Sequence, residues 1–129
     1  MLLTAKNIAP TKNTPEVILD PDGIIIIRGR SMIPNVTEFS DQIGDWIDLY
    51  ISNPPEYTSI DLYLEYLNTN NYKLYITILS KIETIKLKNK KYIINWYYDE
   101  GDEDIIEKGE YISSIAEVPF NFIMISDPL

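Results

Sequence analysis

The chain has 129 residues, and its 11 lysines and arginines against 20 aspartates and glutamates give a formal net charge of −9. It contains neither histidine nor cysteine, which excludes imidazole and thiolate metal ligands, disulfides, thiol catalysis and Ser-His-Asp hydrolysis. An enzyme of this composition would depend on paired carboxylates or on a cation held by oxygen ligands. The 45% hydrophobic content is sufficient for one packed core, so we expect a single domain over residues 1–129.

The acidic balance also bears on partners and location. Nucleic acids and anionic membranes both require a cationic surface, which argues against either as a partner. The first residues lack a basic segment followed by an apolar one, and no stretch reaches the about 18 uncharged apolar residues of a membrane span. We therefore expect a cytoplasmic protein with no nucleic-acid partner, no membrane partner and no cofactor.

The first predicted elements are two strands of a hairpin, after a polar lead that contains two prolines. Glu16 to Asp20 and Ile24 to Arg28 are rich in β-formers, and Pro21-Asp22-Gly23 between them suits a tight reversal. The four consecutive isoleucines of the second run do not alternate with polar residues. This pattern predicts a strand inside the sheet, covered on both faces and ended by Gly29.

A helix, a strand and a second helix follow. From Asn35, apolar residues recur at three- and four-residue steps, which predicts a helix that ends before Pro54-Pro55. Tyr57 to Tyr66 reads as a strand whose second side is less apolar, which favours a place near an edge. Its apolar side comprises Ile60, Leu62, Leu64 and Tyr66. The second helix is expected from about Asn70, with lysines near its C-terminal end, where they suit the helix dipole.

The last third of the chain predicts a strand over Lys91 to Tyr98, a helix from Asp102 to about Ile115 and a strand over Phe120 to Ile125. Gly109 lies inside that helix, where glycine costs about 1 kcal/mol relative to alanine and is expected to shorten or bend it. The order ββαβαβαβ predicts an α/β fold: a single mixed, mostly parallel sheet of about 4–5 strands with helices largely on one face.

Sites in such sheets lie at the C-terminal ends of the parallel strands. Three loops should gather there: Gly29-Arg30-Ser31, Asn68-Thr69-Asn70-Asn71 and the acidic run from Asp99 to Asp104. Asparagine and threonine cap helix N-termini, and capping alone would explain the middle loop. The sharper interpretation is a phosphate on its hydroxyl, because the N–H groups of a helix start stabilise negative charge.

The other two loops have alternative interpretations as well. The acidic run is either a solvated helix start or a site for Mg²⁺ or Ca²⁺, although it lacks the spacing of an EF-hand. Arg28 and Arg30, two residues apart, form either a strand-end ion pair or a clamp for phosphate or carboxylate.

Several segments together resemble the SiaC-type bacterial regulatory phosphoproteins, and they recur in order across nearly the whole chain. They are Thr14-Pro15-Glu16-Val17, Gly29-Arg30-Ser31, Leu64-Glu65-Tyr66-Leu67-Asn68-Thr69, Asn95-Trp96-Tyr97-Tyr98, Asp102-Glu103-Asp104 with Gly109-Glu110, and Pro119-Phe120.

The resemblance implies a STAS-like fold, similar to anti-sigma-factor antagonists, and a protein that is itself a substrate. A partner Ser/Thr kinase phosphorylates a threonine, a metal-dependent phosphatase removes the phosphate, and the unmodified form regulates a target such as a diguanylate cyclase. The family's acceptor lies in a Tyr-Phe-Asn-Thr-Ser-Ser stretch, and the matching residue is Thr69. Here Leu67 replaces the aromatic residue, while Asn70 and Asn71 replace the two serines.

Three functions stay open. The first is this phosphorylation-controlled adaptor, and the second is an adaptor of the same fold that binds an anti-sigma factor or another kinase-like protein. The third is an enzyme that uses Asp102, Asp104 or Glu65 with a divalent ion, although no acid pair has a spacing that demands catalysis. For the adaptors we expect partner contacts around Thr69, from Arg30, Asn68, Asn70, Asn71, Asp102, Glu103 and Asp104.

Overall fold

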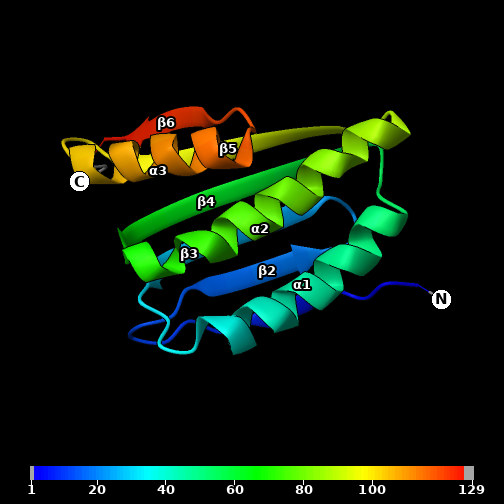
Figure 1. The fold of residues 1–129 in the computed structure, drawn as a ribbon, viewed down its shortest axis with the longest axis horizontal. Coiled ribbons are helices and arrows are strands. Elements are labelled where there is room, and N and C mark those ends of the chain that lie inside the picture. Colours follow the sequence, from blue (N-terminus) through cyan, green and yellow to red (C-terminus); the bar gives the residue numbers. More distant parts are fainter. Residues whose placement is uncertain (1, 127–129) are drawn as a thin grey trace.

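The structure, a computed structural model, describes residues 2–126 and contains one six-stranded sheet whose order follows the chain, β1-β2-β3-β4-β5-β6 (Figure 1). The strands are β1 (Lys6–Ile8), β2 (Glu16–Asp20), β3 (Ile24–Ser31), β4 (Tyr57–Leu67), β5 (Lys91–Asp99) and β6 (Asn121–Ile125). β2 runs antiparallel to both of its neighbours, and the pairs from β3 to β6 are parallel. The prediction of a mixed, mostly parallel sheet is confirmed, but the sheet has six strands rather than the expected 4–5.

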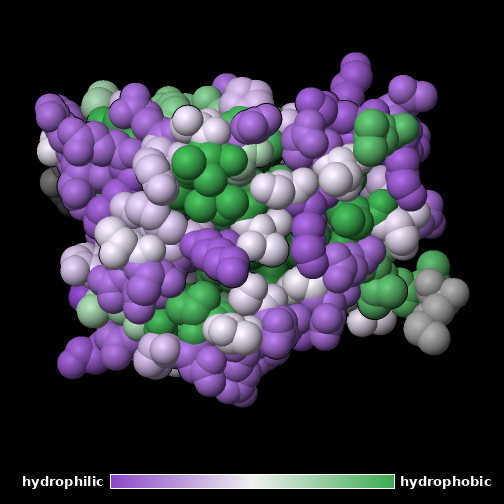
Figure 2. All heavy atoms as spheres, viewed as in Figure 1, coloured by the Kyte–Doolittle hydropathy of each residue, from purple (hydrophilic) through white to green (hydrophobic). Residues whose placement is uncertain are grey.

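The helices lie on one face of this sheet (Figure 1), and hydrophilic side chains predominate on the outer surface of that face (Figure 2). They are α1 (Val36–Ser52), α2 (Tyr72–Glu83) and α3 (Glu103–Ala116), with the short 3-10 helices η1 (Thr69–Asn71) and η2 (Thr84–Lys88) on either side of α2. The connections from β3 to β6 all step in the same direction across the sheet. Crossovers of one hand then place every helix on the same side, so within residues 2–126 the opposite, helix-free face carries no second layer.

The core lies between the helices and the sheet, and its apolar side chains stabilise the fold by leaving water. From the sheet it takes alternate residues of each central strand, and from the helices it takes one apolar stripe. Its fully buried members include Ile25, Ile27, Ile60, Leu62, Ile94, Trp96, Ile43, Ile47, Tyr75, Leu79 and Ile112. The three- and four-residue spacing expected from Asn35 is that of the buried residues of α1, which are Ile43, Trp46, Ile47 and Tyr50.

Two expectations about strands are wrong. β1 was not predicted, because three residues with two polar side chains show no periodicity; it is a strand only through its pairing with β2. β4 lies in the middle of the sheet between β3 and β5 rather than near an edge. The less apolar side of β4 faces the helix-free surface. Polar residues are tolerated there, as they are in a strand at the edge of a sheet, so the sequence pattern of the two positions is the same.

β3 lies inside the sheet as predicted, but helices cover only one of its faces. Ile24, on the helix-free face, is 47% exposed, whereas Ile25 and Ile27 are buried. Gly29 does not end the strand. It adopts a φ of 118°, which favours glycine, and β3 continues to Ser31.

A bulge in β4 changes which side chains reach the surface. Gly29 pairs with Leu64, but the next residue of β3, Arg30, pairs with Tyr66, so Glu65 is an extra residue in β4. Leu64 and Leu67 are buried, while Tyr66 is 44% exposed. The expectation that Tyr66 shares the apolar side of Leu64 is therefore wrong.

Gly109 does not shorten α3, which continues to Ala116. A Cβ atom at this position would lie 2.5 Å from Cε2 of Trp96, so glycine lets α3 pack directly against β5. The indole Nε1 of Trp96 donates to the carbonyl oxygen of Ile105 at 3.0 Å, which fixes the helix on the strand.

Candidate functional site

The C-terminal ends of β3 and β4 meet the start of α3, as the topology predicts. The backbone N–H of Asn68 donates to the carbonyl oxygen of Ser31 at 3.0 Å, which joins the first two loops. Nζ of Lys108, on α3, donates to the carbonyl oxygen of Leu67 at 2.7 Å. These bonds bring the three predicted loops to one edge of the sheet.

Thr69 lies at the surface of this edge. It is the first residue of η1, directly after the end of β4, and η1 continues into α2. Its side chain is exposed. The strand-to-helix junction expected from the sequence is thus present, with its hydroxyl-bearing residue open to solvent.

The asparagines beside Thr69 occupy cap positions, but their side chains do not bond to the helix N-termini. Asn68 is the N-cap of η1 and Asn71 that of α2, and neither makes a side-chain capping hydrogen bond. Asn71 is fully buried instead. Its Oδ1 accepts from Oγ of Ser31 at 2.9 Å and from the N–H of Ile33 at 2.8 Å, and its Nδ2 donates to the carbonyl oxygen of Ile33 at 3.3 Å. The capping interpretation of this run is wrong, and Asn71 faces the protein interior rather than a partner.

Tyr75 of α2 completes this polar network by donating its hydroxyl to Oγ of Ser31 at 2.8 Å. Burial raises the pKa of the Tyr75 hydroxyl above its ordinary value, more than the hydrogen bond to Ser31 lowers it, so the group stays protonated. Ser31 is fully buried as well. A satisfied buried network of this kind fixes the local backbone, here at the end of the short helix η1 that Thr69 begins.

An exposed aromatic ring with two cations lies beside the junction. The guanidinium carbon of Arg30 is 5.5 Å from the ring centroid of Tyr66, and Nζ of Lys108 is 5.6 Å from it. Both distances are in the range of cation–π interactions. Sequence reasoning missed Tyr66 and Lys108. Lys108 had one usable signal: it is the only lysine or arginine after Lys91.

Each of these cations already has a carboxylate partner. Arg30 Nη1 lies 3.9 Å from Oε1 of Glu65, and Lys108 Nζ lies 3.0 Å from Oδ2 of Asp104. Arg28 pairs with Glu16 at 2.5 Å. The two arginines therefore form separate ion pairs instead of one clamp.

The acidic run is the start of α3. Oδ1 of Asp102 accepts from the N–H of Ile105 at 3.2 Å as the N-cap, and Glu103 is exposed in the first turn. Asp99 accepts a hydrogen bond from the Tyr63 hydroxyl, which raises the pKa of that hydroxyl to about 12. Within residues 2–126, no three carboxylates are grouped so that they could hold a metal ion.

A family model for "SiaC family regulatory phosphoprotein" matches residues 8–125. The chain belongs to the SiaC family. A relative of this SiaC-family chain in Pseudomonas aeruginosa (strain UCBPP-PA14), the uncharacterized protein PA14_02130, is 28% identical over 115 residues. That match covers 88% of this chain and 91% of the relative.

Solved structures from Pseudomonas aeruginosa share the fold. A chain in the crystal structure of the diguanylate cyclase SiaD in complex with its activator SiaC is 26% identical to this one and has a TM-score of 0.81, covering 95% of this chain and 99% of that one. The crystal structure of apo-SiaC gives a TM-score of 0.80 at 25% identity, covering 94% and 98%. The homologue SiaC thus binds and activates a diguanylate cyclase.

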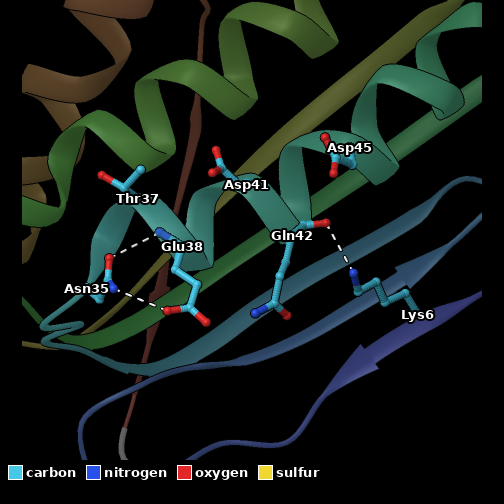
Figure 3. A pocket seen from close by; sticks show the side chains of 7 residues that line it. All are labelled: Lys6, Asn35, Thr37, Glu38, Asp41, Gln42 and Asp45. Atoms are coloured by element: carbon cyan, nitrogen blue, oxygen red, sulfur yellow. Dashed lines mark hydrogen bonds between the residues drawn. The ribbon is translucent and has the colours of Figure 1, made fainter.

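A hollow of this SiaC-family protein, of about 500 Å³, lies away from Thr69, between β1 and the first half of α1 (Figure 3). Two of its polar side chains stabilise the fold: Asn35 Oδ1 accepts from the N–H of Glu38 at 3.2 Å, and Lys6 Nζ donates to the carbonyl oxygen of Gln42 at 3.2 Å. Among the helices of residues 2–126, none combines the length and apolarity needed to cross a bilayer.

Proposed function

We propose that this protein is an adaptor without catalytic activity of its own, switched by reversible phosphorylation of Thr69. A Ser/Thr kinase adds the phosphate, a metal-dependent phosphatase removes it, and the unmodified form binds and activates a diguanylate cyclase. Membership of a family of regulatory phosphoproteins and the likeness to an activator of a diguanylate cyclase support this function. The observation that carries it is the exposed Thr69 at the end of central strand β4.

The surroundings of Thr69 suit a modification that must be both accessible and local. A kinase needs the hydroxyl in solvent, and Thr69 is exposed. The backbone beneath it is fixed by the buried contacts of Asn71 with Ser31 and Ile33. Phosphorylation is therefore expected to change the charge of this edge while its shape is kept.

The charge change is large for this surface. A phosphate adds about −1.5 to −2 charges to an edge where Arg30 and Lys108 are already paired with Glu65 and Asp104. A partner that covers this edge would have to desolvate an unpaired anion, at a cost of several kcal/mol. Because each 1.4 kcal/mol is about a tenfold change in affinity, one phosphate is sufficient for release.

The partner surface in this proposal is centred on Thr69 and extends to α3. It comprises Arg30, Tyr66, Asn68, Asn70, Asp102, Glu103 and Asp104. Asn71 contributes the frame beneath this surface rather than a contact, because it is fully buried.

The first test maps the modification. The protein is incubated with ATP and a lysate of its host, and phosphate is located by mass spectrometry. We expect modification at Thr69, its loss in Thr69→Ala, and its retention in Thr37→Ala, which removes another exposed threonine close to a helix start. Modification at another residue, or none while the kinase is shown to be active, would contradict the proposal.

The second test measures the output. Unmodified protein and Thr69→Ala should bind a diguanylate cyclase of the same host and raise its production of cyclic di-GMP, whereas phosphoprotein and Thr69→Glu should not. Equal binding by the phosphoprotein would overturn the release mechanism. Binding to an anti-sigma factor with no effect on any cyclase would favour the partner-switching adaptor instead.

A further inference from the structure

A groove of about 540 Å³ lies at the end of the sheet opposite Thr69, where β4 and β5 begin. Lys91 and Ile93 reach it from the helix-free face of β5, and Tyr92 and Ile94 reach it from the face that carries the helices. Because side chains of both faces line it, the groove follows the edge of β5 rather than covering either face.

This part of β5 lacks a strand on one side. β6 pairs with β5 only from Asn95, which lies opposite Asn121, to Asp99. Residues Lys91–Ile94 pair with β4, but among residues 2–126 no strand pairs with their other edge. Alternate residues of a parallel strand direct their N–H and C=O groups to each side, so this edge presents unpaired backbone donors and acceptors. Pro119, which precedes β6 and lines the groove, has no N–H to offer them.

Lysines gather at the groove, although the protein as a whole is acidic. Residues 84–92 contain four lysines and neither aspartate nor glutamate, although the chain has a net charge of −9. Lys86, Lys90 and Lys91 line the groove. Lys88 beside it donates to the carbonyl oxygen of Ser52 at 2.8 Å.

Two of the groove lysines have carboxylate partners at the rim. Lys86 pairs with Glu83 at 2.6 Å, and Lys90 pairs with Glu56 at 2.5 Å. The side chain of Glu56 is 85% exposed. Ion pairs as exposed as these are weak, so the carboxylates of a ligand can replace them at little cost.

We propose that this groove binds an extended acidic peptide segment of a partner protein, which adds to β5 as a strand over Lys91–Ile94, in line with β6. Main-chain hydrogen bonds to the free edge provide affinity, as in other cases of strand addition. Lysines at the rim select acidic side chains, and the ring of Tyr57 and the side chain of Ile93 accommodate apolar ones between them. The proposal is independent of Thr69, which lies at the other end of β4.

The test uses an acetylated and amidated hexapeptide of alternating valine and glutamate. We expect it to bind the full-length protein in calorimetry and to slow hydrogen exchange of the backbone amides within residues 91–94. Methylation of alternate backbone nitrogens of the peptide removes the N–H groups that would donate to the edge of β5. It should lower the affinity by about tenfold or more. No binding, equal binding of the methylated peptide, or slowed exchange only outside the groove would overturn the proposal.

Charge-reversal variants distinguish binding in the groove from unspecific electrostatic attraction between the acidic peptide and lysines elsewhere on the protein. Lys91→Glu should weaken peptide binding about threefold to tenfold, since it reverses a charge at the rim. Lys12→Glu makes the same change on an exposed lysine outside the groove and should leave binding unchanged, as should Thr69→Ala. An equal loss in Lys12→Glu and Lys91→Glu would show unspecific attraction and contradict the proposed site. Loss of phosphorylation in Thr69→Ala with intact peptide binding keeps this inference separate from the proposed switch.

Discussion

The two ends of the sheet fix their buried polar groups in different ways. At the end that carries Thr69, Asn71 bonds to Ser31 and to both backbone groups of Ile33, and Tyr75 adds a further bond to Ser31. At the other end, the buried polar contact of β4 is one pair of hydroxyls, Tyr50 and Thr58, at 2.6 Å. The larger of these two buried polar networks thus lies at the end that carries the exposed Thr69.

This difference explains why a charge change at Thr69 need not disturb the fold. The turn of η1 is connected to β3 by side-chain bonds that are out of contact with solvent. The lysine groove at the other end offers a free strand edge and weak surface ion pairs, which are features of a surface that exchanges partners. The Thr69 end keeps its shape through buried hydrogen bonds, whereas the opposite end has a strand edge to which a peptide can add.

The largest expected effect is the loss of the Asn71 side chain. Asn71→Ala should lower the free energy of unfolding by about 3 kcal/mol, because the N–H and C=O of Ile33 and the hydroxyl of Ser31 lose a buried partner. Urea unfolding followed by circular dichroism measures it. Asn68→Ala is the control, with a change within about 0.5 kcal/mol, since this side chain makes no capping bond. Equal losses in both variants would contradict a special role for the network.

The second effect concerns the packing of α3 at the Thr69 end. Gly109→Ala should cost about 1–2 kcal/mol, because its Cβ would lie 2.5 Å from the indole of Trp96 and overpacking outweighs the better helix propensity.

Gly44, in the interior of α1, is the matched control. Its added Cβ meets only Nζ of Lys81, at an ordinary 3.6 Å. Gly44→Ala should therefore stabilise the protein by up to about 1 kcal/mol. Thermal unfolding of both variants gives the comparison, and stabilisation by Gly109→Ala would show that α3 does not depend on close contact with Trp96.

The third effect tests the single hydroxyl pair at the opposite end. Thr58→Val should cost about 1 kcal/mol, because it leaves the buried Tyr50 hydroxyl without its partner. The double variant Tyr50→Phe/Thr58→Val removes both polar groups and should recover part of that loss. Urea unfolding of the single and double variants measures the coupling. A Thr58→Val loss as large as that of Asn71→Ala would remove the difference between the two ends.

The smallest effect depends on pH. Hydrogen bonding to Asp99 raises the pKa of the Tyr63 hydroxyl from 10.0 to about 12, so the folded state holds this proton more tightly than the unfolded state. The stability from this bond is complete below pH 10 and is lost as the pH rises through about 12. Tyr63→Phe should therefore destabilise the protein relative to wild type at neutral pH, with the difference shrinking in alkaline urea titrations. A difference that grows with pH would contradict this bond.

The fold could be predicted from the sequence wherever one periodicity extends over a whole element. The helix from Asn35 to Pro54-Pro55 and the hairpin before it follow from local patterns alone. Features that depend on a neighbouring strand could not be predicted: β1 exists only through β2, and the bulge at Glu65 is defined by the register with β3. Since that bulge exposes Tyr66, the surface beside Thr69 could not be read from the sequence.

The candidate site was predictable in part for the same reason. The convergence of the strand ends follows from topology, and Thr69 was found through a family resemblance. The burial of Asn71 depends on how close the end of β3 lies, which no pattern within Asn68 to Asn71 encodes. The contact of Lys108 with Leu67 likewise needs the close packing of α3 that Gly109 permits.

The strand order has a consequence for how the protein is made. From β2 to β6, each strand pairs with the strand that precedes it in the chain. During synthesis, each new strand therefore finds its partner already in place, and no edge has to wait for a distant segment. Each parallel pair from β3 to β6 nevertheless has to close a loop that contains a helix before its contacts form, which makes folding slower than in a helical bundle. We expect a growing sheet that is completed in the order of translation, with the Thr69 junction formed before α3 is added.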